Sequence, residues 1–372
     1  MLPEQIQIIG PLIPPNEITD WGTEQRLKLF GWAEGGYTGA STGTGLLNIE
    51  PKMNRYGNSW LFNQGALVLE RTLDESDWSW GFRAEFYMGA DAALLRPITG
   101  FGPTNPRFGT DFRQAYVSFH APVLTDGGVD VTIGRQYVPL GYETTMAPYR
   151  PMYSLAYAWI YSQNGATTGA IATFHITPQL DLLAGVTLGV NSEFDLRGWG
   201  PSYIARAVYW TGEDKRTKLV GTVYTGPEPI AAAKGHLGTW ETEVELQVVH
   251  NLNPRLTLVS ETNFGSDRRD PLNNYQNSSW FGTYGMAIVH AHRTLDINFR
   301  AEWFDDTDGS RTGHRASYGE ITTGINFMPT VWMNFRPEIR YDLSGAPVFG
   351  PEGTAHPQNH QWTFAFETLL KF

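Results

Sequence analysis

The chain has 372 residues, a formal net charge of −11 and no cysteine. The lack of cysteine excludes disulfide frameworks, thiolate metal sites and cysteine nucleophiles, and the acidic balance argues against nucleic acid as a partner. Mean hydropathy is −0.30 and aromatic residues make up 13%. No run of about 18 apolar residues occurs, which excludes helical membrane spans.

Residues 1–25 are expected to form an extended N-terminal segment, because prolines recur along it (Pro3, Pro11, Pro14, Pro15). Residues 1–22 lack a basic region followed by an apolar core and small cleavage residues. For an exported protein this indicates a mature or trimmed chain.

Period-two alternation begins near residue 26 and is clearest over 78–89. There, one face carries large apolar residues (Trp78, Trp80, Phe82, Ala84, Phe86, Met88). The opposite face includes Arg83 and Glu85. Ionised groups between bulky apolar neighbours fit a wall with lipid on one side and water on the other, whereas the core of a soluble protein would penalise them.

Further strands are predicted at similar spacing along the whole chain (26–39, 62–72, 110–121, 128–137, 165–177, 179–191, 201–212, 215–225, 237–250, 254–265, 277–291, 293–305, 315–327, 330–343, 360–372). Segment 153–163 has enough alternation for one more strand. Short turns alternate with long loops, as in outer-membrane barrels. The predicted fold is all-β, with residues 26–372 forming a closed antiparallel transmembrane barrel of about sixteen strands.

The last strand, 360–372, ends on Phe372, which completes an apolar face that also carries Trp362 and Phe364. We interpret Phe372 as an insertion signal for membrane assembly. Aromatic residues near strand ends predict two interfacial girdles (Trp60, Trp78, Trp80, Tyr203, Tyr209, Trp210, Trp240, Trp280, Trp303, Trp362). The alternative, a soluble β-sandwich with an aromatic core, leaves the charged alternate positions unexplained.

The loop 138–164 is long and partly apolar, and it follows the fifth long predicted strand. Side chains of the wall cannot fill the lumen of so wide a barrel, so we expect this loop to fold inward and form the pore constriction. The residues expected near its tip are Glu143, Tyr149, Arg150 and Tyr153. The alternative is an external loop that packs on itself or on a neighbouring subunit.

Charged residues at alternate positions predict a polar pore wall with solvated, partly paired charges that tune ion selectivity. The expected wall residues are Arg83, Glu85, Glu241, Glu243, Glu245, Arg300, Arg336, Glu338 and Arg340. Carboxylates expected to face inward outnumber basic groups expected to face inward, which predicts a mild preference for cations. Simple parity places Arg135 on the lipid face, where it would lie at headgroup level unless a bulge turns it inward.

Several segments resemble the OmpL-like family of outer-membrane β-barrel porins (31–37, 54–58, 80–83, 134–143, 303–311). The resemblance implies a pore in the bacterial outer membrane, without a particular solute and without catalytic residues. The loop beyond Glu143 matches no pattern of that family.

Metal sites and cofactors are not expected. Asp305, Asp306 and Asp308 are a weak Ca²⁺ candidate, since they lack the spacing and distal Glu of an EF-hand. His356 and His360 are four apart but flank a proline, which argues against a helical zinc site.

The leading function is a passive porin for ions and small hydrophilic solutes. We expect it to assemble as a homotrimer and to have outer-membrane lipid and lipopolysaccharide as its partners. One alternative is a barrel enzyme, for which His250 and Ser260, on the apolar faces of adjacent predicted strands, are the candidate residues. Another is a structural barrel that anchors a surface layer and has a blocked lumen.

Overall fold

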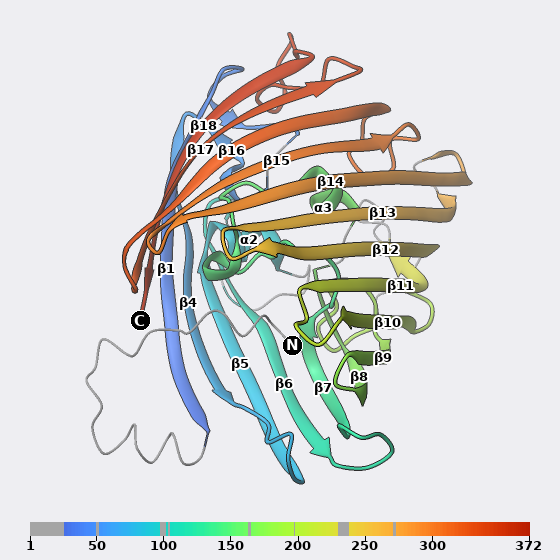
Figure 1. Ribbon diagram of the computed structural model, residues 1–372. Coiled ribbons are helices and arrows are strands. Elements are labelled where there is room, and N and C mark those ends of the chain that lie inside the picture. Colours follow the sequence, from blue (N-terminus) through green and yellow to red (C-terminus); the bar gives the residue numbers. More distant parts are fainter. Residues whose placement is uncertain are drawn as a thin grey trace.

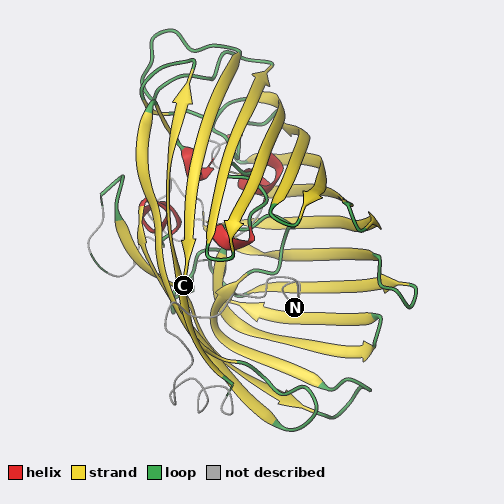
Figure 2. Cartoon of the chain, turned by 60° about the vertical axis from the view of Figure 1, so that its left-hand side comes forward, coloured by secondary structure: helices red, strands yellow, loops and turns green. Residues whose placement is uncertain are grey.

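A computed structural model describes residues 26–49, 52–96, 102, 105–162, 165–196, 198–229, 238–270 and 273–372. In this part of the chain, sixteen strands close into one antiparallel barrel (Figures 1 and 2). The predicted fold is therefore confirmed. The predicted N-terminal segment 1–25 lies outside the described residues.

Each barrel strand pairs with its neighbours in sequence, and β18 pairs with β1 to close the ring. The strands are β1 (Leu27–Ala40), β4 (Ser59–Arg71), β5 (Ser79–Gly89), β6 (Gly109–Ala121), β7 (Val129–Tyr137), β8 (Ala166–Thr177), β9 (Leu180–Thr187), β10 (Ser202–Thr211), β11 (Thr217–Pro229), β12 (Gly238–Asn253), β13 (Leu256–Asp270), β14 (Gln276–His292), β15 (Leu295–Asp306), β16 (Ala316–Thr330), β17 (Met333–Ser344) and β18 (His360–Lys371).

The other described elements are short. They are the paired strands β2 (Gly45–Leu46) and β3 (Tyr56–Gly57), the helices α2 (Ala90–Leu95) and α3 (Tyr157–Ser162), and the 3-10 turns η1 (Lys52–Asn54) and η2 (Ala147–Tyr149). None of the described helices is long and apolar enough to cross a membrane.

The barrel closes at its C-terminal residue. The backbone N–H of Gly31 donates to the carbonyl of Phe372 at 2.7 Å, and the N–H of Phe372 donates to the carbonyl of Gly31 at 3.0 Å. Because a closed sheet leaves no unpaired edge, every strand satisfies its backbone groups within the ring, as a membrane requires.

The two faces of each strand differ as the alternation predicts. On β18, Trp362 and Phe364 are 42% and 57% exposed, whereas Gln361, Thr363 and Glu367 are buried. The exposed face is apolar and the inner face is polar, which is the arrangement that lipid outside a barrel favours.

Connections between strands alternate in length. Turns of two residues join β8 to β9, β12 to β13, β14 to β15 and β16 to β17. The connections on the other side are longer, among them 138–165 and 345–359. Because the strand count is even, the start of β1 and the end of β18 both lie on the side of the short turns.

The described part of segment 153–163, residues 153–162, contains no strand, so the additional strand that the sequence left open is not found there. Tyr157–Ser162 forms α3 instead. Its first-turn N–H groups at Tyr157 and Ala158 donate to the Glu302 carboxylate at 2.7 and 3.0 Å. A carboxylate at this end satisfies donors that a helix leaves free, and that partner lies far away in the sequence.

Trp280 does not belong to an interfacial girdle, which corrects another expectation. It is 2% exposed on the inner face of β14. Its indole lies over Gly265, where an added Cβ would come within 2.0 Å of the ring. The Arg311 guanidinium stacks on the ring at 4.3 Å from its centroid. Gly265 leaves room for the indole on the inner face, and the guanidinium gives it a cation–π partner there.

Arg135 is turned inward, the second of the two alternatives. Gly134 has φ +134°, a conformation that favours glycine, and the strand changes face there. Arg135 is buried and donates to Asp111 on β6 at 2.8 Å. The change of face at Gly134 therefore places the Arg135 guanidinium beside the buried Asp111 carboxylate.

Candidate pore constriction

Residues 138–162, called the loop segment below, make polar contacts with the inner faces of many strands. At its start, the N–H groups of Gly141 and Tyr142 donate to Glu245 on β12 and Glu261 on β13, at 3.0 and 2.7 Å. The backbone of the loop segment therefore begins by crossing to strands that lie far along the wall from β7.

Glu143 anchors the middle of the loop segment. Its carboxylate accepts from Arg300 on β15 at 2.5 Å and from the N–H of Ala156 at 2.7 Å. Burial raises the pKa of Glu143, and the Arg300 guanidinium opposes that rise. Arg300 also donates to the carbonyl oxygen of Ser154 at 3.0 Å, so one guanidinium fixes two points of the segment.

Arg150 is buried and forms an ion pair with Glu34 on β1. Glu367 on β18 lies 3.9 Å from the same guanidinium. Burial alone lowers the pKa of Arg150, but the carboxylates of Glu34 and Glu367 outweigh it and raise the pKa. The side chain is therefore a permanent cation in a paired environment.

Carbonyl groups of the loop segment are held by guanidinium groups of the wall. Arg336 on β17 donates to the carbonyl oxygens of Ala147, at 2.7 Å, and of Arg150. Arg340, four residues further along β17, donates to the carbonyl oxygen of Leu155 at 2.8 Å. Two arginines on one strand thus bind three carbonyl groups.

N–H groups of the loop segment are held by carboxylates of the wall. Glu338, between Arg336 and Arg340 on β17, accepts from Tyr153 at 3.0 Å and from Ser154 at 3.1 Å. The Tyr153 hydroxyl donates to Asn63 on β4 at 2.7 Å. Because N–H groups meet carboxylates and carbonyl groups meet guanidiniums, the wall charges match the polarity of the loop backbone.

The predicted constriction residues are brought to one region only in part. Arg150 and Tyr153 are buried together, with the guanidinium 5.9 Å from the ring centroid. Glu143 is bound to β15 instead. Tyr149 is half-buried and, with Arg150, lines a cavity of 670 Å³ that also includes Asp296 and Lys371.

The predicted wall residues lie on inner faces, but they are buried, which corrects the expectation of solvated charges (Arg83, Glu85, Glu241, Glu243, Glu245, Arg300, Arg336, Glu338, Arg340). Arg83 binds Glu85 and Glu70, each at 2.6 Å. The physical reason is that the loop segment and its neighbours occupy the space in front of these side chains.

Several inner residues were missed by sequence reasoning. Arg311, in the loop after β15, donates to the carbonyl oxygen of Tyr161 at 2.5 Å and to Glu241 at 3.1 Å. Glu367 binds Arg336, and its place on the polar face of β18 was a usable signal. For Arg311 the alternation gave no signal, because loops carry no face periodicity.

The weak Ca²⁺ candidate has its carboxylates directed to protein donors. Asp306 accepts from the N–H of Thr312 at 2.7 Å, Asp305 from the Ser317 hydroxyl at 2.6 Å, and Asp308 from the N–H of Ser279 at 2.9 Å. Within the described ranges, no group of three or more metal-ligating side chains is placed to hold an ion.

The two candidate catalytic residues, His250 and Ser260, are apart in register. His250 contacts the Thr217 hydroxyl at 2.8 Å. It pairs across the sheet with Leu258, whereas Ser260 pairs with Val248. His250 therefore contacts a threonine on β11, whereas Ser260 lies on β13, the neighbour on the other side.

The barrel resembles solved outer-membrane proteins. The anion-selective porin from Comamonas acidovorans matches with a TM-score of 0.64 and 13% identity, over 93% of this chain and 99% of the other. The outer membrane channel DcaP of Acinetobacter baumannii gives 0.62 and 9%, over 93% and 97%. OmpT of Vibrio cholerae in its trimer form gives 0.59 and 7%, over 93% and 99%.

No curated protein sequence matches this chain. At these low identities, the solved structures establish the fold alone. A family profile described as "Putative beta-barrel porin-2, OmpL-like" matches residues 26–372, which is the whole predicted barrel. The chain therefore belongs to this OmpL-like family of β-barrel porins, and its location is the bacterial outer membrane.

Proposed function

We propose that this porin forms a water-filled channel for passive diffusion of ions and small hydrophilic solutes, with a mild preference for cations. The polar inner faces of the sixteen strands support a hydrophilic path. No catalytic residue is part of the proposal.

We also propose that the loop segment narrows this channel. The single observation that carries the proposal is the set of bonds from β15 and β17 to the loop backbone, through Arg300, Arg336, Glu338 and Arg340. A loop tied to the wall at so many points has a defined position, and a defined position is what a size filter requires.

The cation preference follows from the charge of the interior. Among the described buried side chains, carboxyl groups outnumber guanidinium groups. The excess is concentrated on β12, where Glu241, Glu243 and Glu245 follow one another on the inner face. Low-dielectric walls focus such a field on a passing ion.

Purified protein in planar bilayers tests these proposals through conductance steps and the reversal potential across a KCl gradient. We expect discrete conductance steps and a reversal potential that shows a preference for K⁺ over Cl⁻. Glu243→Gln is an informative variant, because neither carboxylate oxygen has a hydrogen-bond partner in the described part of the chain. It removes an ionisable group without removing a bond, so cation preference should fall by about two-fold at unchanged conductance.

Glu352→Gln serves as the matched control, because Glu352 is exposed in the loop before β18. It should leave selectivity unchanged. A folded protein without any conductance would contradict the channel proposal. It would instead support a structural barrel with a blocked lumen.

The proposed partners are outer-membrane lipid with lipopolysaccharide around the barrel, and two further copies of the chain in a homotrimer. The exposed apolar side chains of the outer face support lipid contact. The trimer form of the Vibrio cholerae protein, which shares this fold, supports the oligomer.

A further inference from the structure

The inner face of the barrel has a cavity of 670 Å³ at its short-turn end. Side chains of β14 to β18 and of the turns β14–β15 and β16–β17 line it. Residues 148–151 of the loop segment line it as well, so the cavity lies between the pore mouth and the proposed constriction. Its volume is within the range of about 300–1,000 Å³ that is usual for small-molecule sites.

Positive charge predominates among the side chains that line this cavity. Three of them are cationic, Arg150, Arg293 and Lys371, and the one carboxylate among the described lining residues is Asp296. Asp296 is already engaged, because its oxygen lies 2.8 Å from Nδ1 of His290. The charge balance of the cavity is therefore opposite to that of the inner face of β12.

Two of the three cations are available to a solute. Arg150 is paired with Glu34. Arg293 is exposed in the β14–β15 turn, and Lys371 is half-buried at the end of β18. In the part of the chain that the structure describes, neither side chain has an ion-pair or hydrogen-bond partner. A negatively charged group that enters this mouth thus meets two cations that no described carboxylate neutralises.

Two asparagines add uncharged polar groups to the cavity. Asn326 on β16 and Asn334 on β17 line it and are only 8% and 7% exposed. The amide oxygen of each is buried without a hydrogen-bond partner among the described residues. Buried polar groups are normally hydrogen-bonded, and an amide can turn either its oxygen or its N–H toward a ligand. The two amides therefore indicate a place where a polar ligand completes the site.

Apolar side chains lie between the two available cations. Met328 and Val331, from the β16–β17 hairpin, line the cavity. The N–H of Met328 donates to the carbonyl oxygen of Thr294, in the β14–β15 turn, at 2.8 Å, and the N–H of Lys371 donates to that of Trp332 at 2.7 Å. The hairpin is thus flanked by one cation on each side. Such a surface fits a ligand that has both a negative group and an apolar body.

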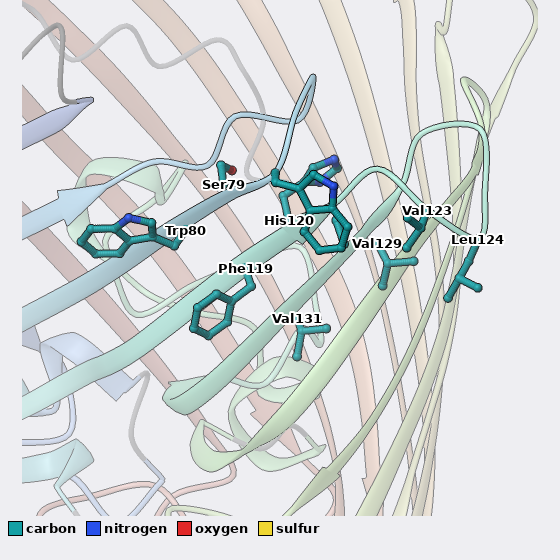
Figure 3. Close-up of a pocket in the computed structure, with 10 residues that line it drawn as sticks. Ser79, Trp80, Phe119, His120, Val123, Leu124, Val129 and Val131 are labelled. Carbon is teal, nitrogen blue, oxygen red and sulfur yellow. The ribbon is translucent and has the colours of Figure 1, made fainter.

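The cavity in Figure 3 provides a comparison at the same end of the barrel. It measures 650 Å³ and lies on the outer face of β5 to β7, where Trp80, Phe119 and Val131 line it. Among the described residues that line it, none is a lysine, an arginine or an acid. The combination of cations with apolar side chains therefore belongs to the inner mouth and not to the short-turn end in general.

We infer that the inner cavity binds small amphipathic carboxylates. Arg293 and Lys371 attract the carboxylate, and Met328 and Val331 contact the apolar body. The role of this site in solute passage rests on the proposed function, whereas binding itself does not need a conducting pore. A mild cation preference of the whole channel is compatible with this site, because the excess of carboxylates is concentrated on β12.

Isothermal titration calorimetry of the purified protein, in detergent at low salt and neutral pH, tests the inference with hexanoate as the probe. Hexanoate should bind. Hexanamide has the same body without the charge, and acetate has the charge without the body. Both should bind more weakly than hexanoate by about ten-fold.

The variant with Arg293→Gln and Lys371→Gln should weaken hexanoate binding by about ten-fold or more. The matched control carries Lys215→Gln and Arg255→Gln. It removes two exposed cations from the β10–β11 and β12–β13 connections, which are on the same side of the barrel and do not line the cavity. This control should keep the wild-type affinity.

Lys371 precedes the residue that closes the barrel, so the double variant could assemble poorly. Arg293→Gln alone, in an exposed turn, then carries the test and should weaken binding by about three-fold. No binding of hexanoate, equal binding of hexanamide, an unchanged affinity in folded Arg293→Gln, or an equal loss in the control each overturns the inference. A wild-type protein that binds hexanoate but never conducts contradicts the proposed function instead.

Discussion

Arg150 supplies the buried positive charge of the loop segment that pairs with Glu34 on β1. Replacing it with alanine leaves Glu34 buried without its ion-pair partner, and breaking a buried pair costs about 3–5 kcal/mol. Arg150→Ala should therefore shift selectivity toward cations by about two-fold and add noise to the open channel. Reversal potentials and single-channel records measure both effects.

Arg150→Lys is the control for charge alone. It keeps the cation but not the planar guanidinium, so selectivity should stay near wild type while the noise increases. Anion selectivity that persists in Arg150→Ala would show that the loop segment does not lie on the ion path.

Glu338 tests the positioning of the same segment without changing its sequence. Its carboxylate accepts from the N–H groups of Tyr153 and Ser154. Glu338→Gln replaces charged acceptors with a neutral one, a loss of about 1 kcal/mol per bond. The segment should become less fixed, and single-channel conductance should fluctuate between levels.

The readout for Glu338→Gln is the lifetime of conductance substates in bilayers. Glu352→Gln should show the wild-type pattern. Uninterrupted wild-type steps in Glu338→Gln would mean that the remaining guanidinium contacts suffice to hold the segment.

At the scale of elements, β18 and its closure with β1 decide assembly. Phe372 is paired with Gly31 by two backbone bonds, and its side chain is 39% exposed on the outer face. Phe372→Asp keeps the backbone bonds but places a charge toward lipid. We expect reduced amounts in the outer membrane and near-normal folding in detergent, measured by membrane fractionation and by heat-dependent gel migration.

Phe372→Tyr retains the aromatic ring and should assemble normally. Normal membrane levels of Phe372→Asp would contradict the role of Phe372 as an insertion signal.

Strands were predictable from this sequence because apolar residues that face lipid alternate with polar residues that face the barrel interior within each strand. On β18, the alternation of Trp362 and Phe364 with Thr363 and Glu367 is visible without any partner. Boundaries were less predictable, as β9 shows. It ends at Thr187, and three residues later the N–H of Val190 donates to the Glu228 carboxylate on β11 at 2.8 Å instead of to a ladder partner.

The site was less predictable than the fold because its contacts are distant in sequence. Local residues identified a long loop with Glu143 and Arg150, and inner faces with Arg300 and Glu338. Nothing local shows that these charges bind the loop backbone instead of water. Arg135 was ambiguous for a related reason, since its direction depends on the conformation of Gly134.

At the scale of the whole molecule, the proposed homotrimer gives a direct expectation. Each chain contains a complete barrel, so one trimer should insert into a bilayer as three equal conductance steps that close separately. Chemical cross-linking in native membranes should give a species of three chains. A single step per insertion, with only monomers after cross-linking, would contradict the trimer.

The bonds that fix the loop segment also set an order of events. The loop segment precedes its partners on β15 and β17 by 144 to 189 residues. During synthesis and insertion, the strands on both sides of the segment exist long before the charges that will hold it. Contacts so far apart form slowly, because a long stretch of chain must be ordered first. The interior of the barrel is therefore completed after its wall, and a barrel that lacks its last four strands keeps the contacts of the loop segment with β1, β4, β12 and β13 but none of those with β15 and β17.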